Sequence, residues 1–155
     1  MSTLRVWLVS LSSTALFLVC RVAHSDELAS FITQKYETGL RNMETMHAID
    51  TDGDGMVSLE EWLAFQNRVF SALDKTNSGF IDASEFYGSD RDMTPIAPGA
   101  FITGLRTKEM FMKIGPDAQG RISREEYLGF QRKIFDMMDK DHKKNIGPGD
   151  FILNK

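Results

Sequence analysis

The stretch that decides the fold is residues 50–61, which read Asp50-Thr51-Asp52-Gly53-Asp54-Gly55-Met56-Val57-Ser58-Leu59-Glu60-Glu61. Alternate aspartates in a tight loop can direct their carboxylates at one point, and a glycine at the sixth position permits the sharp turn that this requires. A hard divalent cation prefers six to eight oxygens at about 2.3–2.6 Å. We therefore predict that this stretch, loop 1, binds a calcium ion rather than serving as an acidic turn that caps a helix. The predicted ligands are Asp50, Asp52, Asp54, Met56 (carbonyl), Ser58 (hydroxyl or bridging water) and Glu61 (both carboxylate oxygens).

A second stretch of the same kind, loop 2, spans residues 74–85. It keeps the leading aspartate, the sixth glycine and the final glutamate, but hydroxyl side chains replace the third and fifth acids. Because loop 2 offers three carboxylates where loop 1 offers four, we expect weaker binding there and about two calcium ions per chain. The predicted ligands are Asp74, Thr76, Ser78, Phe80 (carbonyl), Asp82 and Glu85.

The chain contains an internal repeat with an offset of 65 residues, which aligns residues 60–66 with residues 125–131. Duplication of one supersecondary unit sets the architecture, and it places loop 3 (115–126) and loop 4 (139–150) opposite the first two. Loop 3 begins with Gly115 in place of an acid and adds Arg121. Loop 4 carries Lys143 at a ligand position and Lys144 in place of the glycine, and it ends in a shorter acid, Asp150. We expect these two loops to pair with each other and to hold no calcium; weak binding at one of them is the alternative.

Apolar residues three or four positions apart predict helices on both sides of the loops, and no segment shows a strand-like alternation. We therefore predict an all-α fold, with Val57 pointing into the core from a short strand that pairs with the neighbouring loop. Pro95 and Pro98 mark a linker. The predicted domains are a leader (1–25), an intact pair of loops (26–88), the linker (89–99) and a degenerate pair (100–155). The expected helices carry Leu28, Ile32, Tyr36, Leu40, Met43 and Met46; Trp62, Phe65, Val69, Phe70 and Leu73; Phe101, Ile102, Leu105 and Phe111; and Tyr127, Phe130, Ile134, Phe135 and Met138.

Loop 1 with its flanking helices resembles an EF-hand, so the all-α fold is expected to consist of two EF-hand pairs. Only residues 62–73 separate loops 1 and 2, which is about 18 Å of helix, so one central helix must serve both loops. In calmodulin each loop has its own two helices. The compact spacing is similar to that of the small secreted or periplasmic bacterial EF-hand proteins related to lanmodulin, a resemblance that implies metal binding. Loop 1 lacks the second-position proline and ninth-position carboxylate of lanmodulin, which favours calcium over lanthanides in this chain.

The N-terminal 25 residues have the features of a secretory leader: Arg5, an apolar run of residues 6–20, and small residues before a cut after Ser25. We expect a secreted or periplasmic protein without a later membrane span; an uncleaved anchor and a lipoprotein signal at Cys20 are the alternatives. Removing the leader leaves 16 basic and 22 acidic residues, a net charge of −6, which argues against a nucleic-acid partner. It also removes the one cysteine, which excludes disulfides and thiolate-bound zinc.

Two classes of function fit these features. One is a calcium sensor whose helices expose an apolar groove for a protein or peptide partner; the other is a passive calcium buffer or a calcium-stabilised scaffold, and a lanthanide-binding protein is a further alternative. Methionines suit adaptable interaction surfaces, although core packing is their commoner role. An enzyme is not expected, because His47 and His142 lie in separate halves and no nucleophile accompanies them. The methionines at helical positions are Met43, Met46, Met110, Met112, Met137 and Met138.

Overall fold

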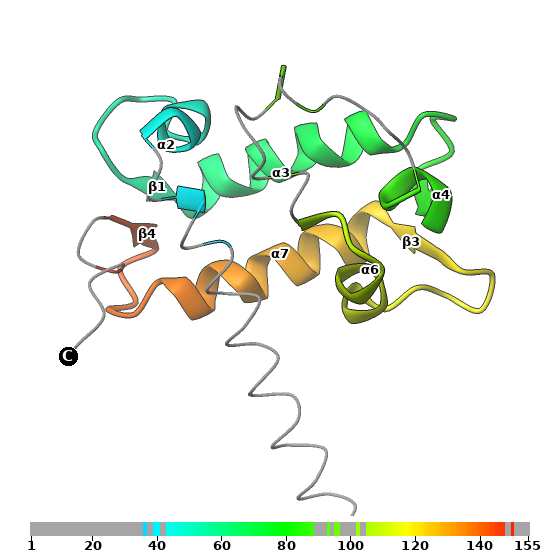
Figure 1. Cartoon of the computed structure of the whole chain (residues 1–155). Coiled ribbons are helices and arrows are strands. Elements are labelled where there is room, and N and C mark those ends of the chain that lie inside the picture. The colour runs from blue at the N-terminus through cyan, green and yellow to red at the C-terminus, as the bar shows by residue number, and fades with distance from the viewer. Residues whose placement is uncertain are drawn as a thin grey trace, which may run out of the picture. The chain divides into compact units, whose positions relative to one another are not determined.

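The computed structural model describes residues 36, 39–40, 43–88, 93, 95–96, 102, 105–147 and 150. The predicted leader, most of the predicted linker and the beginning of the first predicted helix lie outside these residues. Figure 1 shows the elements in chain order. They are α2 (Met43–Ile49), β1 (Val57–Ser58), α3 (Leu59–Leu73), β2 (Phe80–Asp82), α4 (Ala83–Phe86), α6 (Lys108–Ile114), β3 (Arg121–Ser123), α7 (Arg124–Met138) and β4 (Asn145–Ile146).

Two helices, α3 and α7, form the centre of the fold and reproduce the sequence repeat. Each has 15 residues, and each begins after a serine, Ser58 or Ser123, that accepts a hydrogen bond from the backbone N–H of the third helical residue. That third residue is a glutamate whose side chain bonds back to the serine N–H, so both helices begin with the same capping box. Helix α3 leaves loop 1 and enters loop 2, and α7 does the same for loops 3 and 4. The predicted central helix shared by two loops is therefore confirmed.

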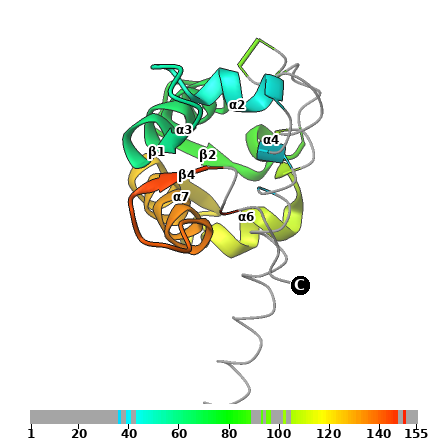
Figure 2. The same ribbon diagram turned by 90° about the vertical axis from the view of Figure 1, so that its left-hand side faces the viewer.

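The apolar stripes of α3 and α7 are buried against each other. Trp62, Phe65 and Phe70 of α3 and Met138 of α7 are fully buried. The Trp62 indole Nε1–H donates to the Gln131 carbonyl at 3.0 Å, which ties the two helices together across the core. Figures 1 and 2 show the two helices side by side and running in opposite directions. A helix of this length spans about 22 Å, so the two loops of one half lie at opposite ends of it.

Short antiparallel ladders join the loops, and they correct two expectations. Strand β1 of loop 1 pairs with β4 of loop 4, and β2 of loop 2 pairs with β3 of loop 3. The expected pairing of loop 3 with loop 4 is therefore wrong. A shared central helix holds the loops of one half apart, whereas the opposite directions of α3 and α7 bring loop 1 to loop 4 and loop 2 to loop 3. The described part of the chain is mostly helical with two small sheets, rather than strictly all-α.

The register of both ladders places an apolar residue from each loop opposite another. Val57 faces Ile146 in the first ladder, and Ile81 faces Ile122 in the second. All four side chains are fully buried. The predicted inward position of Val57 and its short strand are confirmed, but its partner strand comes from the other half of the sequence.

The third predicted helix is interrupted. Ile102 and Leu105 are helical, but Arg106 and Thr107 are not, and α6 begins only at Lys108. The Thr107 side chain accepts a hydrogen bond from the Met110 backbone N–H at 3.1 Å, which is the interaction that begins a new helix. Phe101 lies outside the described residues. Among the helices that the structure describes, none has the length and apolar character needed to cross a membrane.

Candidate metal centre

Loop 1 brings its three aspartates together. Asp50, Asp52 and Asp54 each offer a carboxylate oxygen, and these oxygens lie within 4.8 Å of one another. Asp50 is buried at the end of α2, while the other two are exposed. The Asp50 carboxylate is fixed by the loop backbone, because its Oδ1 accepts from the Gly53 N–H at 2.7 Å and its Oδ2 from the Gly55 N–H at 3.0 Å. The convergence predicted from the sequence is present.

The two glycines of loop 1 allow the backbone to turn its N–H groups inward. Gly53 and Gly55 have φ angles of 75° and 83°, in the left-handed region that favours glycine. Side chains at these positions would be strained by the backbone conformation rather than by crowding, because a Cβ added at either glycine would meet no atom within 4 Å beyond the adjoining residues. The sixth-position glycine thus has the role that the sequence pattern gives it.

The twelfth residue of loop 1, Glu61, closes the loop. Its Oε1 accepts from the Thr51 N–H at 2.7 Å and the Thr51 hydroxyl at 2.9 Å, and its Oε2 accepts from the Ser58 N–H and hydroxyl at 2.9 and 2.8 Å. Partial burial by itself would raise the pKa of Glu61, but the hydrogen bonds from Ser58 and Thr51 outweigh it and lower the pKa to about 2. Glu61 is therefore anionic at neutral pH and joins both ends of the loop.

Loop 2 repeats this arrangement with fewer acids. The Asp74 carboxylate accepts from the Ser78 N–H and the Gly79 N–H, both at 2.9 Å. Glu85 accepts from the Lys75 N–H at 3.0 Å and from the Asp82 N–H at 3.3 Å, as Glu61 does from the corresponding residues of loop 1. Asp74 and Glu85 are both buried.

Asp82, the predicted ninth-position ligand, caps a helix in the structure. It is the N-cap of α4, and its Oδ1 accepts from the Ser84 hydroxyl at 2.7 Å and from the Glu85 N–H at 2.9 Å. The hydroxyl of Ser84 and the backbone N–H of Glu85 lower the pKa of Asp82. Ser58 likewise caps α3 in loop 1. In both loops, therefore, the side-chain oxygen of the ninth residue caps the N-terminus of the following helix.

The geometry of loops 1 and 2 agrees with a comparison of the sequence with known families. Residues 43–66 and 67–87 match the model of the EF hand. These two adjacent segments are EF-hands. The two matched segments contain loops 1 and 2 with the whole of α3 between them, and they end before loops 3 and 4. No curated protein matches the chain.

Loop 4 keeps the closed shape of an EF-hand loop, which its sequence did not lead us to expect. Asp139 accepts from the Lys143 and Lys144 N–H groups at 3.0 and 2.8 Å. Asp150 accepts from the Lys140 and Gly147 N–H groups at 3.3 and 2.9 Å. As in loops 1 and 2, the first acid accepts from the sixth residue, and the last acid accepts from the second and ninth residues. Lys144 adopts the left-handed conformation of the missing glycine, with φ of 65°.

Loop 4 also contains a second convergent set of acids. Asp139, Asp141 and Asp150 each offer an oxygen within 4.8 Å of the others. The aspartates at the first and third positions indicate this cluster in the sequence, but the nearby lysines argued against a metal site there. A salt bridge of 2.7 Å joins the Lys143 Nζ to the Asp141 carboxylate, so this set includes a cation from the chain.

Loop 3 departs most from the EF-hand arrangement. Its second residue is Pro116, which has no N–H to donate to the twelfth residue. Glu126 keeps the bonds from the N–H and hydroxyl of the ninth residue, Ser123, as Glu61 does from Ser58. Asp117 accepts from the Arg121 N–H at 2.8 Å and forms a 3.2 Å salt bridge with the Arg121 guanidinium. The backbone N–H of Arg121 is the main reason that the pKa of Asp117 is lowered. A side-chain cation thus also lies in this loop.

Proposed function

We propose that this protein binds calcium at loops 1 and 2, with one ion in each loop. The observation that carries the proposal is the convergence of the Asp50, Asp52 and Asp54 carboxylates in a segment that matches the EF-hand model. The donors available there are all oxygens, which suits a hard cation. Asp50 and Glu61 are held by backbone N–H groups, so the loop needs little ordering when an ion enters.

Loop 1 is the tighter site under this proposal. It supplies four carboxylates, whereas loop 2 supplies three, and one of these, Asp82, is already bonded to the first turn of α4. Calcium affinity in EF-hand loops rises with the number of charged ligands and with the rigidity of the site.

Titration calorimetry of the purified protein tests the proposal. We expect about two calcium ions per chain with unequal affinities. A titration without binding heat, with the amide resonances of Gly55 and Gly79 unmoved by calcium, would contradict it. A parallel lanthanide titration addresses metal preference: lanthanides also bind hard oxygen sites, so we expect binding at loop 1, with calcium as the physiological ion.

We further propose that calcium binding is coupled to a change in exposed apolar surface, as in a sensor. Loop 1 lies between α2 and α3, so an ion there acts on the ends of two helices. Met46, Met110 and Met138 are buried, whereas Met112 is 60% exposed and Met137 is 38% exposed. A movement of the helices can expose the buried methionines and so enlarge the methionine surface that is already accessible.

An apolar fluorescent dye distinguishes the sensor from the buffer or scaffold. A calcium-dependent rise in dye fluorescence supports a surface that opens for a protein partner. A fall or no change, with calcium still bound, supports a passive buffer or a scaffold that calcium stabilises.

We also propose that the protein is exported, on the strength of the leader pattern in residues 1–25. N-terminal sequencing of the protein recovered from its natural host should begin at Asp26. An intact N-terminus would contradict a cleaved leader.

A further inference from the structure

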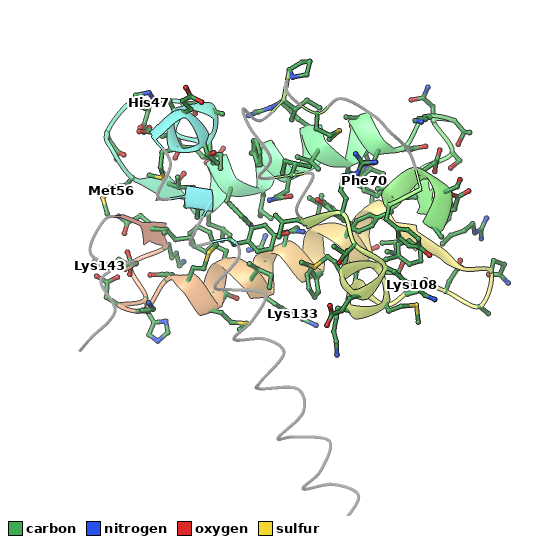
Figure 3. All side chains as sticks on the ribbon, in the orientation of Figure 1. His47, Met56, Phe70, Lys108, Lys133 and Lys143 are labelled. Atoms are coloured by element: carbon green, nitrogen blue, oxygen red, sulfur yellow. The ribbon has the colours of Figure 1, made fainter. Side chains whose placement is uncertain are left out.

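The cation in loop 4 is placed where loop 1 has an acid. Lys143 is the fifth residue of its loop, and the fifth residue of loop 1 is Asp54. The Lys143 ammonium nitrogen lies 2.7 Å from an oxygen of Asp141. Bonding to Asp141, with further attraction from the charges of Asp150 and Asp139, raises the pKa of Lys143. Figure 3 shows Lys143 at the same end of the molecule as Met56 of loop 1.

A positive charge favours the close approach of the carboxylates in loop 4. Three anionic groups with oxygens within 4.8 Å repel one another, and repulsion at this distance is appreciable even near the surface. The backbone N–H groups hold Asp139 and Asp150 in place, and the Lys143 ammonium group pairs with Asp141, which offsets part of the negative charge of the set. The loop therefore obtains from its own chain what loop 1 is expected to obtain from calcium.

We propose that Lys143 is the built-in cation of loop 4, which lets this loop keep its closed shape without metal and excludes a divalent ion from it. Lys143 thereby determines how many ions the chain binds. The contrast with loop 1 rests on the proposed calcium binding, but the metal-free closure of loop 4 does not.

Closure of loop 4 has a consequence for loop 1, because the two share a ladder. The Leu59 N–H, at the start of α3, donates to the Lys144 carbonyl at 3.2 Å. Met56 of loop 1 lies against Gly147, where an added Cβ would come within 2.9 Å of the Met56 methyl group. A loop 4 that is ordered before calcium arrives holds β1, and with it the end of loop 1, in position.

The variant K143N tests the proposal, with K133Q as its matched control. K143N removes the cation and places an oxygen donor at the fifth position of loop 4. K133Q removes one positive charge from an exposed position on α7, labelled in Figure 3. In calcium titration calorimetry we expect K143N to bind one more ion than the wild type, and K133Q to bind the same number. An unchanged stoichiometry in K143N, or an ion in loop 4 of the wild type, would overturn the proposal.

Hydrogen exchange in calcium-free buffer gives a second readout that does not depend on metal binding. The Leu59 amide proton reports the ladder of loops 1 and 4, and the Arg124 amide proton, bonded to the Gly79 carbonyl at 3.3 Å, reports the other ladder. An exposed ion pair contributes little, so we expect the Leu59 proton to exchange about two- to fivefold faster in K143N, with Arg124 unchanged. Equal acceleration at both protons, or at neither, would overturn the proposal. Failure of calcium to bind loops 1 and 2 would refute the proposed function while leaving this readout intact.

Discussion

Loops 1 and 4 face each other across one ladder and share one pattern of backbone hydrogen bonds, but they differ in the charge at their centre. In each, the first acid accepts from the sixth residue, and the last acid accepts from the second and ninth residues. Loop 1 then has a fifth-position acid, Asp54, where loop 4 has Lys143. Loops 1 and 4 therefore share the backbone pattern of an EF-hand loop but differ in the charge of the fifth side chain. On our proposal, this side chain decides whether the cation of the loop comes from solution or from the chain.

The second ladder, between loops 2 and 3, also pairs a loop that is proposed to bind calcium with a loop that contains an internal ion pair. Loop 2 keeps the bond of loop 1 from the sixth residue to the leading aspartate, and its partner, loop 3, has an internal cation in Arg121. The Arg121 guanidinium also lies 4.4 Å from the centroid of the Phe80 ring. The backbone carbonyl of Phe80 is a predicted ligand of loop 2. Each ladder thus joins one loop suited to calcium with one loop that carries its own positive charge.

The largest effect on stability is expected from truncating the buried isoleucines of the ladders to alanine. I146A removes a fully buried side chain that faces Val57, and I122A removes one that faces Ile81. Each substitution should cost about 2–5 kcal/mol of unfolding free energy. In chains that remain folded, I146A should weaken calcium binding at loop 1 and I122A at loop 2.

The amide resonances of Gly55 and Gly79 report the two loops separately during a calcium titration, because each N–H bonds the leading aspartate of its loop. If I146A left the Gly55 titration unchanged, or if I122A affected loop 1 instead of loop 2, the pairing across the repeat would be wrong.

The next effect concerns the last acid of loop 1. E61Q removes the charge that joins Thr51 to Ser58 and that is expected to bind calcium through two oxygens. We expect the tightest calcium affinity to fall by about tenfold to a hundredfold, or ~1.4–2.8 kcal/mol, in calorimetry. An unaltered affinity would show that loop 1 is not the tighter calcium site.

A smaller effect is expected from pH in calcium-free buffer. Glu61 has a folded-state pKa of about 2, below its ordinary value of 4.5. Its stabilising contribution is therefore fully present above the unfolded-state pKa and is lost as the pH falls from about 4.5 towards 2. The difference in unfolding free energy between wild type and E61Q, from denaturant titrations, should shrink across this window. A constant difference would show that Glu61 is not held as an anion by its N–H partners.

The smallest effect is expected from E126Q, the substitution in loop 3 that matches E61Q. Glu126 bonds only Ser123 among the loop contacts described, because Pro116 provides no N–H. Calcium stoichiometry should stay at about two ions per chain. Loss of one ion in calorimetry would mean that loop 3 binds metal.

Much of the site could be predicted from local sequence. The acids of loop 1 and the sixth-position Gly55 depend on contacts within a dozen residues, and the pattern records them directly. The apolar eighth position also indicated that Val57 points inward, but not that it faces Ile146. The shared helix also followed from simple spacing. In contrast, the pairing of loop 1 with loop 4 depends on the relative direction of α3 and α7, which no local pattern reports.

Two features of loop 4 also needed the structure. Lys144 replaces a glycine, yet its backbone takes the left-handed conformation that the loop requires, because the Lys144 N–H gains a bond to the buried Asp139. From the sequence, Lys143 is a cation at a position that should hold a metal ligand. In the structure it forms an ion pair with Asp141 and supplies a positive charge to the loop. The sequence shows the type of each residue, but not which charge lies beside which.

Long-wavelength anomalous diffraction from crystals grown with calcium would locate each bound ion and so decide between loops that take a cation from solution and loops that carry their own. We predict calcium peaks in loops 1 and 2, surrounded by the acids of residues 50–61 and 74–85, and none in loops 3 and 4. A peak in loop 4 beside Lys143, or no peak among Asp50, Asp52 and Asp54, would contradict this prediction.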